Sequence, residues 1–122
     1  MKLYKSTEDY LEQILILENE IKQVRTIDIA NSMKLTKQSV HRAIKNFKEN
    51  ELINVDSNNF ISLTEKGRNI AQSIYDRHIL LTNFFIKLGV SKDIARDDAC
   101  KIEHEISNES LHAIEDFLKN KE

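Results

Sequence analysis

The stretch DDACKIEHEI, residues 97–106, places a thiol, a carboxylate and an imidazole within five positions. Cys100 is the single cysteine of the chain, and Glu103 and His104 are the third and fourth residues after it. Residues 92–106 contain no Gly or Pro, and their apolar residues recur at spacings of three and four, which predicts an amphipathic helix. At about 100° per residue, the three side chains would share an arc of about 100° on that helix. Because Cys, His and carboxylate are common ligands of transition metals, this face is a candidate part of a metal site.

A cysteine packed as a small apolar residue beside a solvated Glu–His pair would produce the same pattern, so a metal site needs further ligands. Two other segments carry ligand types: STEDYLEQ places two carboxylates three positions apart, and YDRHILL places an imidazole in an apolar helical stripe. Each feature alone is more often structural than metal-binding. Together the three segments supply six candidate metal ligands, which are Asp9, Glu12, His78, Cys100, Glu103 and His104.

The composition is that of a globular chain, with 122 residues, 31% charged and 40% hydrophobic. The absence of Pro and the presence of only two Gly residues favour a mostly helical fold of one compact unit or two very small ones. No apolar run approaches the roughly 20 residues that cross a membrane, and the N-terminus has no apolar signal-peptide core. One cysteine cannot form an internal disulfide, so we expect a cytoplasmic location.

The charge distribution is more informative than the formal net charge of −2. Residues 1–20 carry a net charge of −3, residues 21–68 carry +4, and residues 69–122 carry −3. A basic middle between acidic ends indicates that only the middle of the chain faces an anion.

The same basic region has the pattern of a winged helix. Thr26 is a candidate cap for a short helix, KLT breaks it, and Thr36 is a candidate cap for the helix KQSVHRAIKNFKEN. Two short helices joined by a tight turn predict a helix-turn-helix. LINV and FISL then flank the turn residues DSNN, which predicts a β-hairpin.

The second helix of this pair and the hairpin tip carry side chains suited to DNA. Lys and Ser can bind phosphates, whereas Gln and Arg can read base edges in the major groove. A lysine-rich solvated helix is the ordinary alternative, but the order helix, turn, helix, hairpin argues against it. The candidate DNA-binding residues are Thr36, Lys37, Gln38, Ser39, His41, Arg42, Lys45, Ser57, Asn58 and Asn59.

The remainder of the chain is expected to be helical. Thr64 would cap a long helix that Gly89 ends, Ser91 would cap the next helix, and Ser107 the last one. We therefore expect a mostly α protein: a winged helix-turn-helix DNA-binding domain with a small hairpin wing at 1–68, whose linking helix continues to about 88, and a helical domain at 69–122. The apolar face expected to form a homodimer comprises Leu111, Ile114, Phe117 and Leu118.

Taken together, STEDYLEQI, the helix-turn-helix, LTEKG, YDRHILL and DDACKIEHEIS resemble the iron- and manganese-dependent transcriptional repressors, of the diphtheria-toxin-repressor and manganese-transport-regulator type. The resemblance covers about residues 4–118. It implies that the second domain, 69–122, is the metal-binding and dimerisation domain. It also implies a regulator that is not an enzyme and that controls metal homeostasis. Loaded with Fe(II) or Mn(II), such a homodimer binds a palindromic operator in double-stranded DNA.

The residue correspondence with this family is mixed. Asp9 and Glu12 match the manganese type, since iron-type members carry Met at the first of these positions. Cys100 matches the iron type, whereas manganese regulators carry Glu there. The ligands that match both types are His78, Glu103 and His104.

Two further positions depart from the family pattern. The ancillary site of iron-type members would need Glu at Thr82 and His at Arg96, so we expect that site to be absent. The chain ends at residue 122, and we also expect it to lack the C-terminal SH3-like domain of some relatives.

Two other functions fit parts of the pattern. A metal-independent winged-helix regulator that senses an organic ligand would share LTEKG and a helical dimer, but it would have no use for six ligand-type residues. A small metalloenzyme would need an open coordination position and a substrate pocket, and no further polar constellation suggests one. Thiolate favours iron and the carboxylates favour manganese, so the sequence leaves the metal and the number of ions open.

Overall fold

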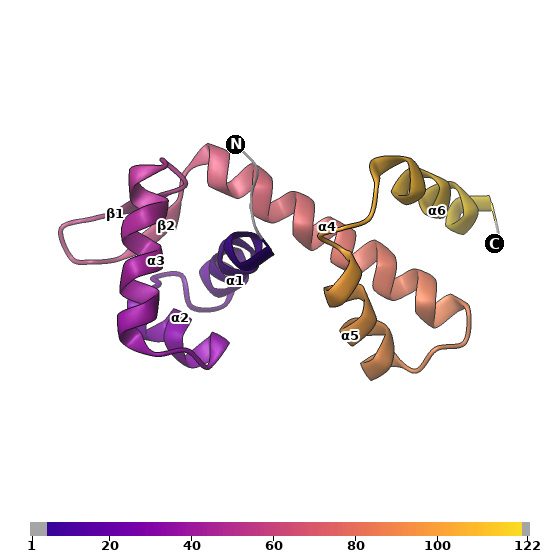
Figure 1. Ribbon diagram of the computed structural model, residues 1–122, viewed down its shortest axis with the longest axis horizontal. Helices are drawn as coiled ribbons and strands as arrows, with labels where there is room; N and C mark the ends of the chain where they lie inside the picture. Colours follow the sequence, from indigo (N-terminus) through magenta and orange to yellow (C-terminus); the bar gives the residue numbers. More distant parts are fainter. Residues whose placement is uncertain (1–4, 121–122) are drawn as a thin grey trace. The chain divides into compact units, whose positions relative to one another are not determined.

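The structure, a computed structural model, describes residues 5–120; the first four and last two residues of the expected domains lie outside this range. Within it, the chain forms six helices and one two-stranded antiparallel hairpin (Figure 1). In chain order the elements are α1 (Lys5–Ile21), α2 (Thr26–Met33), α3 (Lys37–Glu49), β1 (Ile53–Val55), β2 (Ile61–Leu63), α4 (Glu65–Lys87), α5 (Lys92–Ile102) and α6 (Asn108–Asn120). None of the described helices is long and apolar enough to span a membrane.

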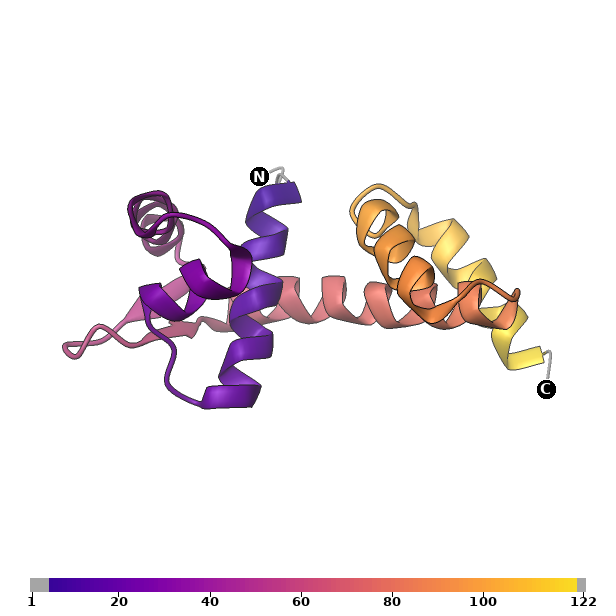
Figure 2. The ribbon, with the colours of Figure 1, turned by 90° about the horizontal axis from the view of Figure 1, so that it is seen from below.

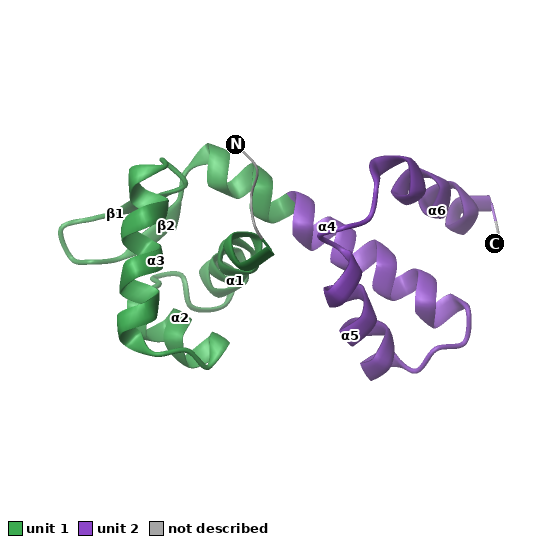
Figure 3. Cartoon of the chain, viewed as in Figure 1, with its two compact units in different colours: residues 1–72 green, residues 73–122 purple. Residues whose placement is uncertain are grey.

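The chain divides into two compact units, residues 1–72 and residues 73–122 (Figure 3). Unit 1 contains α1, α2, α3 and the hairpin, and unit 2 contains α5 and α6. Helix α4 runs through both units as one continuous helix (Figure 2). Each unit has its own apolar core, and each is described below by itself.

The core of unit 1 forms where α1, α2, α3 and the hairpin meet. On α3 the residues Val40, Ile44 and Phe47 recur every three or four positions and are buried, which leaves the opposite face of the helix in solvent. Tyr10 of α1 meets Phe47 edge to face, with ring centroids 5.3 Å apart. The predicted helix-turn-helix is confirmed.

The two helices of the helix-turn-helix begin differently. Thr36 is the N-cap of α3, as expected, because its Oγ1 accepts a hydrogen bond from the Ser39 N–H at 3.1 Å. The expected cap of α2 is wrong by one residue: Thr26 is its first helical residue, and Arg25 is the N-cap. The carboxylate of Asp28, the third residue of the helix, accepts a hydrogen bond from the Arg25 N–H at 2.9 Å, which is one half of a capping box.

The hairpin forms the wing of unit 1 and confirms the predicted strand pair. Ile53 lies opposite Leu63 and Val55 lies opposite Ile61. The Ile61 N–H donates to the Val24 carbonyl at 2.7 Å, which anchors the hairpin to the segment between α1 and α2. Asp56 stabilises the loop, because its Oδ1 accepts hydrogen bonds from two backbone N–H groups of residues 58 and 60.

Two residues fix the start of α4 against the segment that precedes the hairpin: Thr64, through its hydroxyl, and Gly67, through its lack of a side chain. Thr64 caps the helix as expected: its Oγ1 accepts from the Gly67 N–H at 3.0 Å and donates to the Glu51 carbonyl at 2.7 Å. A Cβ at Gly67 would collide with the carbonyl oxygen of Leu52, so this close approach of backbone to helix requires glycine.

The core of unit 2 contains one buried residue from each of α5, α6 and the part of α4 that belongs to this unit. Leu81 of α4, Ala99 of α5 and Leu111 of α6 are buried against one another. Helix α4 ends at Lys87, and Gly89 follows the end of the helix as predicted, with a φ of +104° in the region that favours glycine. The Gly89 N–H and the following N–H close back on the last turn of the helix, which is the hydrogen-bond pattern of a Schellman motif.

Candidate metal centre and nucleic-acid interface

Helix α5 ends earlier than the sequence indicated. We expected helix over residues 92–106, but α5 ends at Ile102, and Glu103 is its C-cap. Residues 103–106, which we call the ligand turn, leave the helix before α6 begins. The expectation of a helix that continues through residue 106 is therefore wrong, although Glu103 keeps helical dihedral angles and its N–H bonds to the Ala99 carbonyl. The apolar period of the sequence continues through Ile106 and gives no sign of this ending, and in the structure two carbonyls of the turn accept hydrogen bonds from Arg77 of α4.

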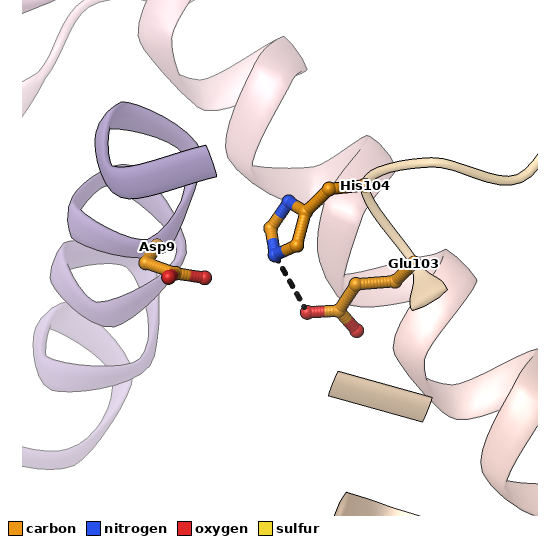
Figure 4. Close-up of side chains that lie close together, drawn as sticks. All are labelled: Asp9, Glu103 and His104. Carbon is orange, nitrogen blue, oxygen red and sulfur yellow. Dashed lines mark ion pairs between the residues drawn. The ribbon is translucent and has the colours of Figure 1, made fainter. Parts of the chain in front are cut away.

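The ligand turn places the Glu103 carboxylate between two imidazoles. The Nδ1 atom of His78, on α4, lies 3.0 Å from Glu103 Oε2. The Nε2 atom of His104 lies 3.5 Å from Glu103 Oε1, and Figure 4 shows this imidazole directed at the carboxylate. The His78–Glu103 pair is separated by 25 residues in the sequence, and all three side chains belong to unit 2.

All three groups are withdrawn from water. The side chains of Glu103 and His104 are 0% and 3% exposed, and that of His78 is 23% exposed. Burial, followed by the positive charge of Arg96, holds the pKa of His78 below its usual value of 6.5. A lowered pKa keeps this imidazole neutral at physiological pH, and the neutral ring is the form that binds a metal.

These three side chains fit a divalent transition metal. A carboxylate with zero exposure is costly unless it is paired or coordinates a cation, and its neighbours here are two nitrogen ligands. The two imidazoles approach different oxygens of this carboxylate, and within the described residues the three side chains do not form one group of ligand atoms within 4.8 Å of one another. They supply donor types that suit Mn, Fe or Zn. Three donors do not complete a coordination sphere, so an ion held here would need further ligands.

The other three predicted ligands are not part of this cluster in unit 2. Asp9 and Glu12 lie on α1 of unit 1, three residues apart, and both are partly buried. Cys100 lies on the last turn of α5 and is exposed. Within the described residues, its thiol is not among the side chains whose ligand atoms gather within 4.8 Å of one another. Their role as ligands stays a prediction.

The expected dimerisation face on α6 is partly used within its own unit. Leu111 is buried against Leu81 and Ala99, and Ile114 packs at the edge of the same cluster. Phe117 is 39% exposed although its ring meets Phe84 edge to face, with centroids 5.9 Å apart. The apolar surface that α6 leaves for a partner is centred on Phe117 rather than on Leu111.

In unit 1, the exposed side of α3 carries most of the predicted DNA-binding residues. Five of these side chains are exposed: Lys37, Gln38, His41, Arg42 and Lys45. The hydroxyls of Thr36 and Ser39 take part in capping the helix: they bond to each other at 3.0 Å, and that of Thr36 accepts from the Ser39 N–H. The hairpin tip, Ser57 to Asn59, is exposed as well, with Asn59 at a φ of +67°.

An open recess of about 290 Å³ lies between α3, the wing and the start of α2. It is lined by Arg25, Thr26, Ile27, Lys37, His41 and Asn59. Its two cations are Arg25 and Lys37, and the Arg25 guanidinium lies 4.4 Å from the centroid of the Phe60 ring, a cation–π contact that holds it in place. Sequence reasoning missed Arg25 and Thr26, although both lie in the basic middle of the chain just before α2.

Comparisons with known proteins agree with both parts. Residues 2–59 match the iron-dependent repressor N-terminal DNA-binding domain, and residues 64–122 match the iron-dependent repressor metal-binding and dimerisation domain. The chain is 34% identical over 112 residues to the transcriptional regulator MntR of Escherichia coli, which covers 92% of this chain and 72% of that protein. It is also 34% identical to MntR of Geobacillus kaustophilus, covering 93% and 81%.

Two solved structures extend the likeness to the fold. The structure of the manganese regulator SloR aligns with a TM-score of 0.80 and 28% identity, covering 98% of this chain and 55% of that one. A manganese-dependent transcriptional repressor in complex with manganese aligns with a TM-score of 0.82 and 27% identity, covering 93% and 52%. The chain thus spans about half the length of these two structures. The matched proteins are described as transcriptional regulators, not as enzymes.

Proposed function

The chain belongs to the iron-dependent repressor family, and on that basis we propose that it is a metal-dependent transcriptional repressor controlling metal homeostasis. In this proposal a homodimer loaded with Fe(II) or Mn(II) binds a palindromic operator in double-stranded DNA in the cytoplasm. The observation that carries it is the buried Glu103 carboxylate held between the imidazoles of His78 and His104. This donor set fits the divalent metals on which the family depends.

For the metal centre we propose six ligands, which are Asp9, Glu12, His78, Cys100, Glu103 and His104. The cluster in unit 2 supports three of them directly. Asp9, Glu12 and Cys100 are proposed because their positions and types correspond to ligands of the family, and because three donors alone are too few. A bound divalent cation would supply the positive charge that offsets these carboxylates.

Asp9 and Glu12 belong to the DNA-binding unit, and the remaining ligands belong to the other unit. A metal ion bound by ligands from both units would add a second link, dependent on metal, to the covalent connection through α4. Two recognition helices of a dimer must enter major grooves about 34 Å apart, so any restraint on their spacing changes operator affinity. We propose that this restraint is how metal availability is converted into repression.

For DNA we propose that α3 enters the major groove, with Gln38 and Arg42 facing base edges and lysines facing phosphates. The recess beside α3 is proposed to receive a backbone phosphate, since Arg25 and Lys37 supply two positive charges there. The wing tip, Ser57 to Asn59, would contact the adjacent backbone or minor groove.

For the homodimer we propose an isologous contact between copies of unit 2. The surface centred on Phe117 and Leu118 of α6 is apolar and at least partly exposed. A two-fold dimer also matches the symmetry of a palindromic operator.

Anaerobic titration of the metal-free protein with Fe(II) and with Mn(II), read out by operator binding, tests this function. We expect operator affinity to rise with either metal and a chelator to reverse the rise. Operator binding that ignores metal and chelator would instead favour a metal-independent winged-helix regulator. The family relationship and the paired imidazoles do not favour that alternative.

A further inference from the structure

One guanidinium group holds the ligand turn from the side of α4. Nη1 of Arg77 donates to the carbonyl oxygen of Glu103 at 3.1 Å and to that of Ile106 at 3.3 Å. Nη2 donates to Oδ1 of Asn108 at 2.8 Å. A single side chain therefore bonds to both ends of the ligand turn and to the first residue of α6.

The carbonyls that Arg77 reaches are groups that need a donor. The last carbonyls of a helix have no partner inside the helix, and a cationic side chain near that end satisfies them and interacts favourably with the helix dipole. The end of α5 and the turn after it present such carbonyls to α4. The planar guanidinium has five N–H donors in a fixed fork, so it can serve three acceptors at once.

Successive residues of α4 hold different parts of Glu103. Arg77 bonds to its backbone carbonyl, and His78 lies 3.0 Å from its carboxylate. The position and the direction of this buried side chain are therefore both set by α4. A group held in this way loses little freedom when it binds a ligand, and partners that orient metal ligands contribute to metal affinity.

We propose that Arg77 is a positioning residue of the metal centre, which preorganises Glu103 and His104 for a divalent cation by holding the backbone of the ligand turn. This inference rests on the proposed function, because it requires that these two side chains bind an ion. Arg77 itself is no ligand, since guanidinium has no acceptor. Through Asn108, the same side chain ties the ligand turn to the start of α6.

Charge and positioning make opposite predictions for Arg77. A cation close to a cation site repels the ion, so loss of the charge alone would tighten metal binding. Loss of positioning would weaken binding, because Glu103 and His104 would have to be ordered by the ion itself. The sign of the change in affinity therefore separates the two roles.

The test is a titration of the metal-free protein, residues 1–122, with Mn²⁺, in which binding is followed by the loss of the EPR signal of the free ion. We expect Arg77→Met to bind Mn²⁺ about 10- to 100-fold more weakly than the original protein. Lys101→Met is the matched control, because it also removes one positive charge. The only ion pair described for Lys101 is a 3.9 Å contact with Asp98, so the affinity for Mn²⁺ should be unchanged or slightly higher. In the absence of metal, amide hydrogen exchange over residues 103–106 should be faster in Arg77→Met, with residues 5–60 unaffected.

Each result decides something. If the original protein does not bind Mn²⁺ or Fe²⁺, the proposed function and this inference both fail. If it binds Mn²⁺ and Arg77→Met binds as well or more tightly, only the inference fails. If Arg77→Met does not fold, Arg77→Lys decides, because it keeps the charge but replaces the planar fork, whose two terminal nitrogens bond to the ligand turn and to Asn108, by a single nitrogen. We expect its affinity to be reduced at least roughly fivefold, and full affinity would overturn the positioning role.

Discussion

Replacing Glu103 by Gln separates metal binding from folding, because the two side chains have the same shape. An apparent binding free energy of about 10–16 kcal/mol over four ligands of a structural zinc site corresponds to roughly 3 kcal/mol per ligand. Mn²⁺ lies below Zn²⁺ in affinity order, so we take about 2.7 kcal/mol, which is roughly 100-fold in Kd. The metal-free protein should change by no more than about 1 kcal/mol, since the amide can still bond to His78 and a buried charge is removed.

The assay is thermal or urea unfolding with and without Mn²⁺, at a concentration 100 times the Kd of the original protein. Under that condition metal should stabilise the original protein by about 2.7 kcal/mol and Glu103→Gln by only about 0.4 kcal/mol. Glu105→Gln is the matched control, because it changes the same charge on an exposed side chain of the same turn. If Glu103→Gln kept the full stabilisation by Mn²⁺, the buried carboxylate would be a structural group and the proposed centre would be misplaced.

Three further results are expected. Arg25→Ala should weaken binding to all DNA sequences and reduce the slope of log K against log salt by about 0.9, as measured by fluorescence anisotropy. An unchanged slope would show that no phosphate binds in the recess. Cys100→Glu should shift the metal preference of operator binding from Fe²⁺ towards Mn²⁺, and an unchanged ratio would indicate that the thiol is no ligand. Because the pKa of His78 is lowered by burial and then by Arg96, the folded metal-free protein resists protonation there, whereas the unfolded chain accepts a proton near pH 6.5. Stability should therefore fall as pH drops below about 6.5 and should not depend on this group above it. Between pH 7.5 and 5.5, urea unfolding should show a smaller loss of stability for His78→Gln than for the original protein. An equal loss would mean that other groups cause the pH dependence.

Local signals in the sequence predicted most of the DNA-binding unit correctly. The stripe of Val40, Ile44 and Phe47 and the capping hydroxyl of Thr36 specified α3, and the turn residues DSNN specified the hairpin. These features act over a few residues, through helical periodicity, capping and turn geometry, so they can be recognised without knowing the fold. The one-residue error at Thr26 arose because the N-cap, Arg25, has no capping hydroxyl that would mark it in the sequence; its N–H bonds to the carboxylate of Asp28.

The sequence by itself also determined the types of the candidate ligands, because three of the six candidates, among them the single cysteine of the chain, lie in DDACKIEHEI. Only the tertiary structure decided that α5 stops at Ile102 and that Glu103 turns inward between His78 and His104. It also decided that Leu111 fills the core of its own unit. The physical reason is that burial and hydrogen bonding at these positions depend on α4, some 25 residues away from the Glu103 carboxylate, and no local periodicity reports a contact over that distance.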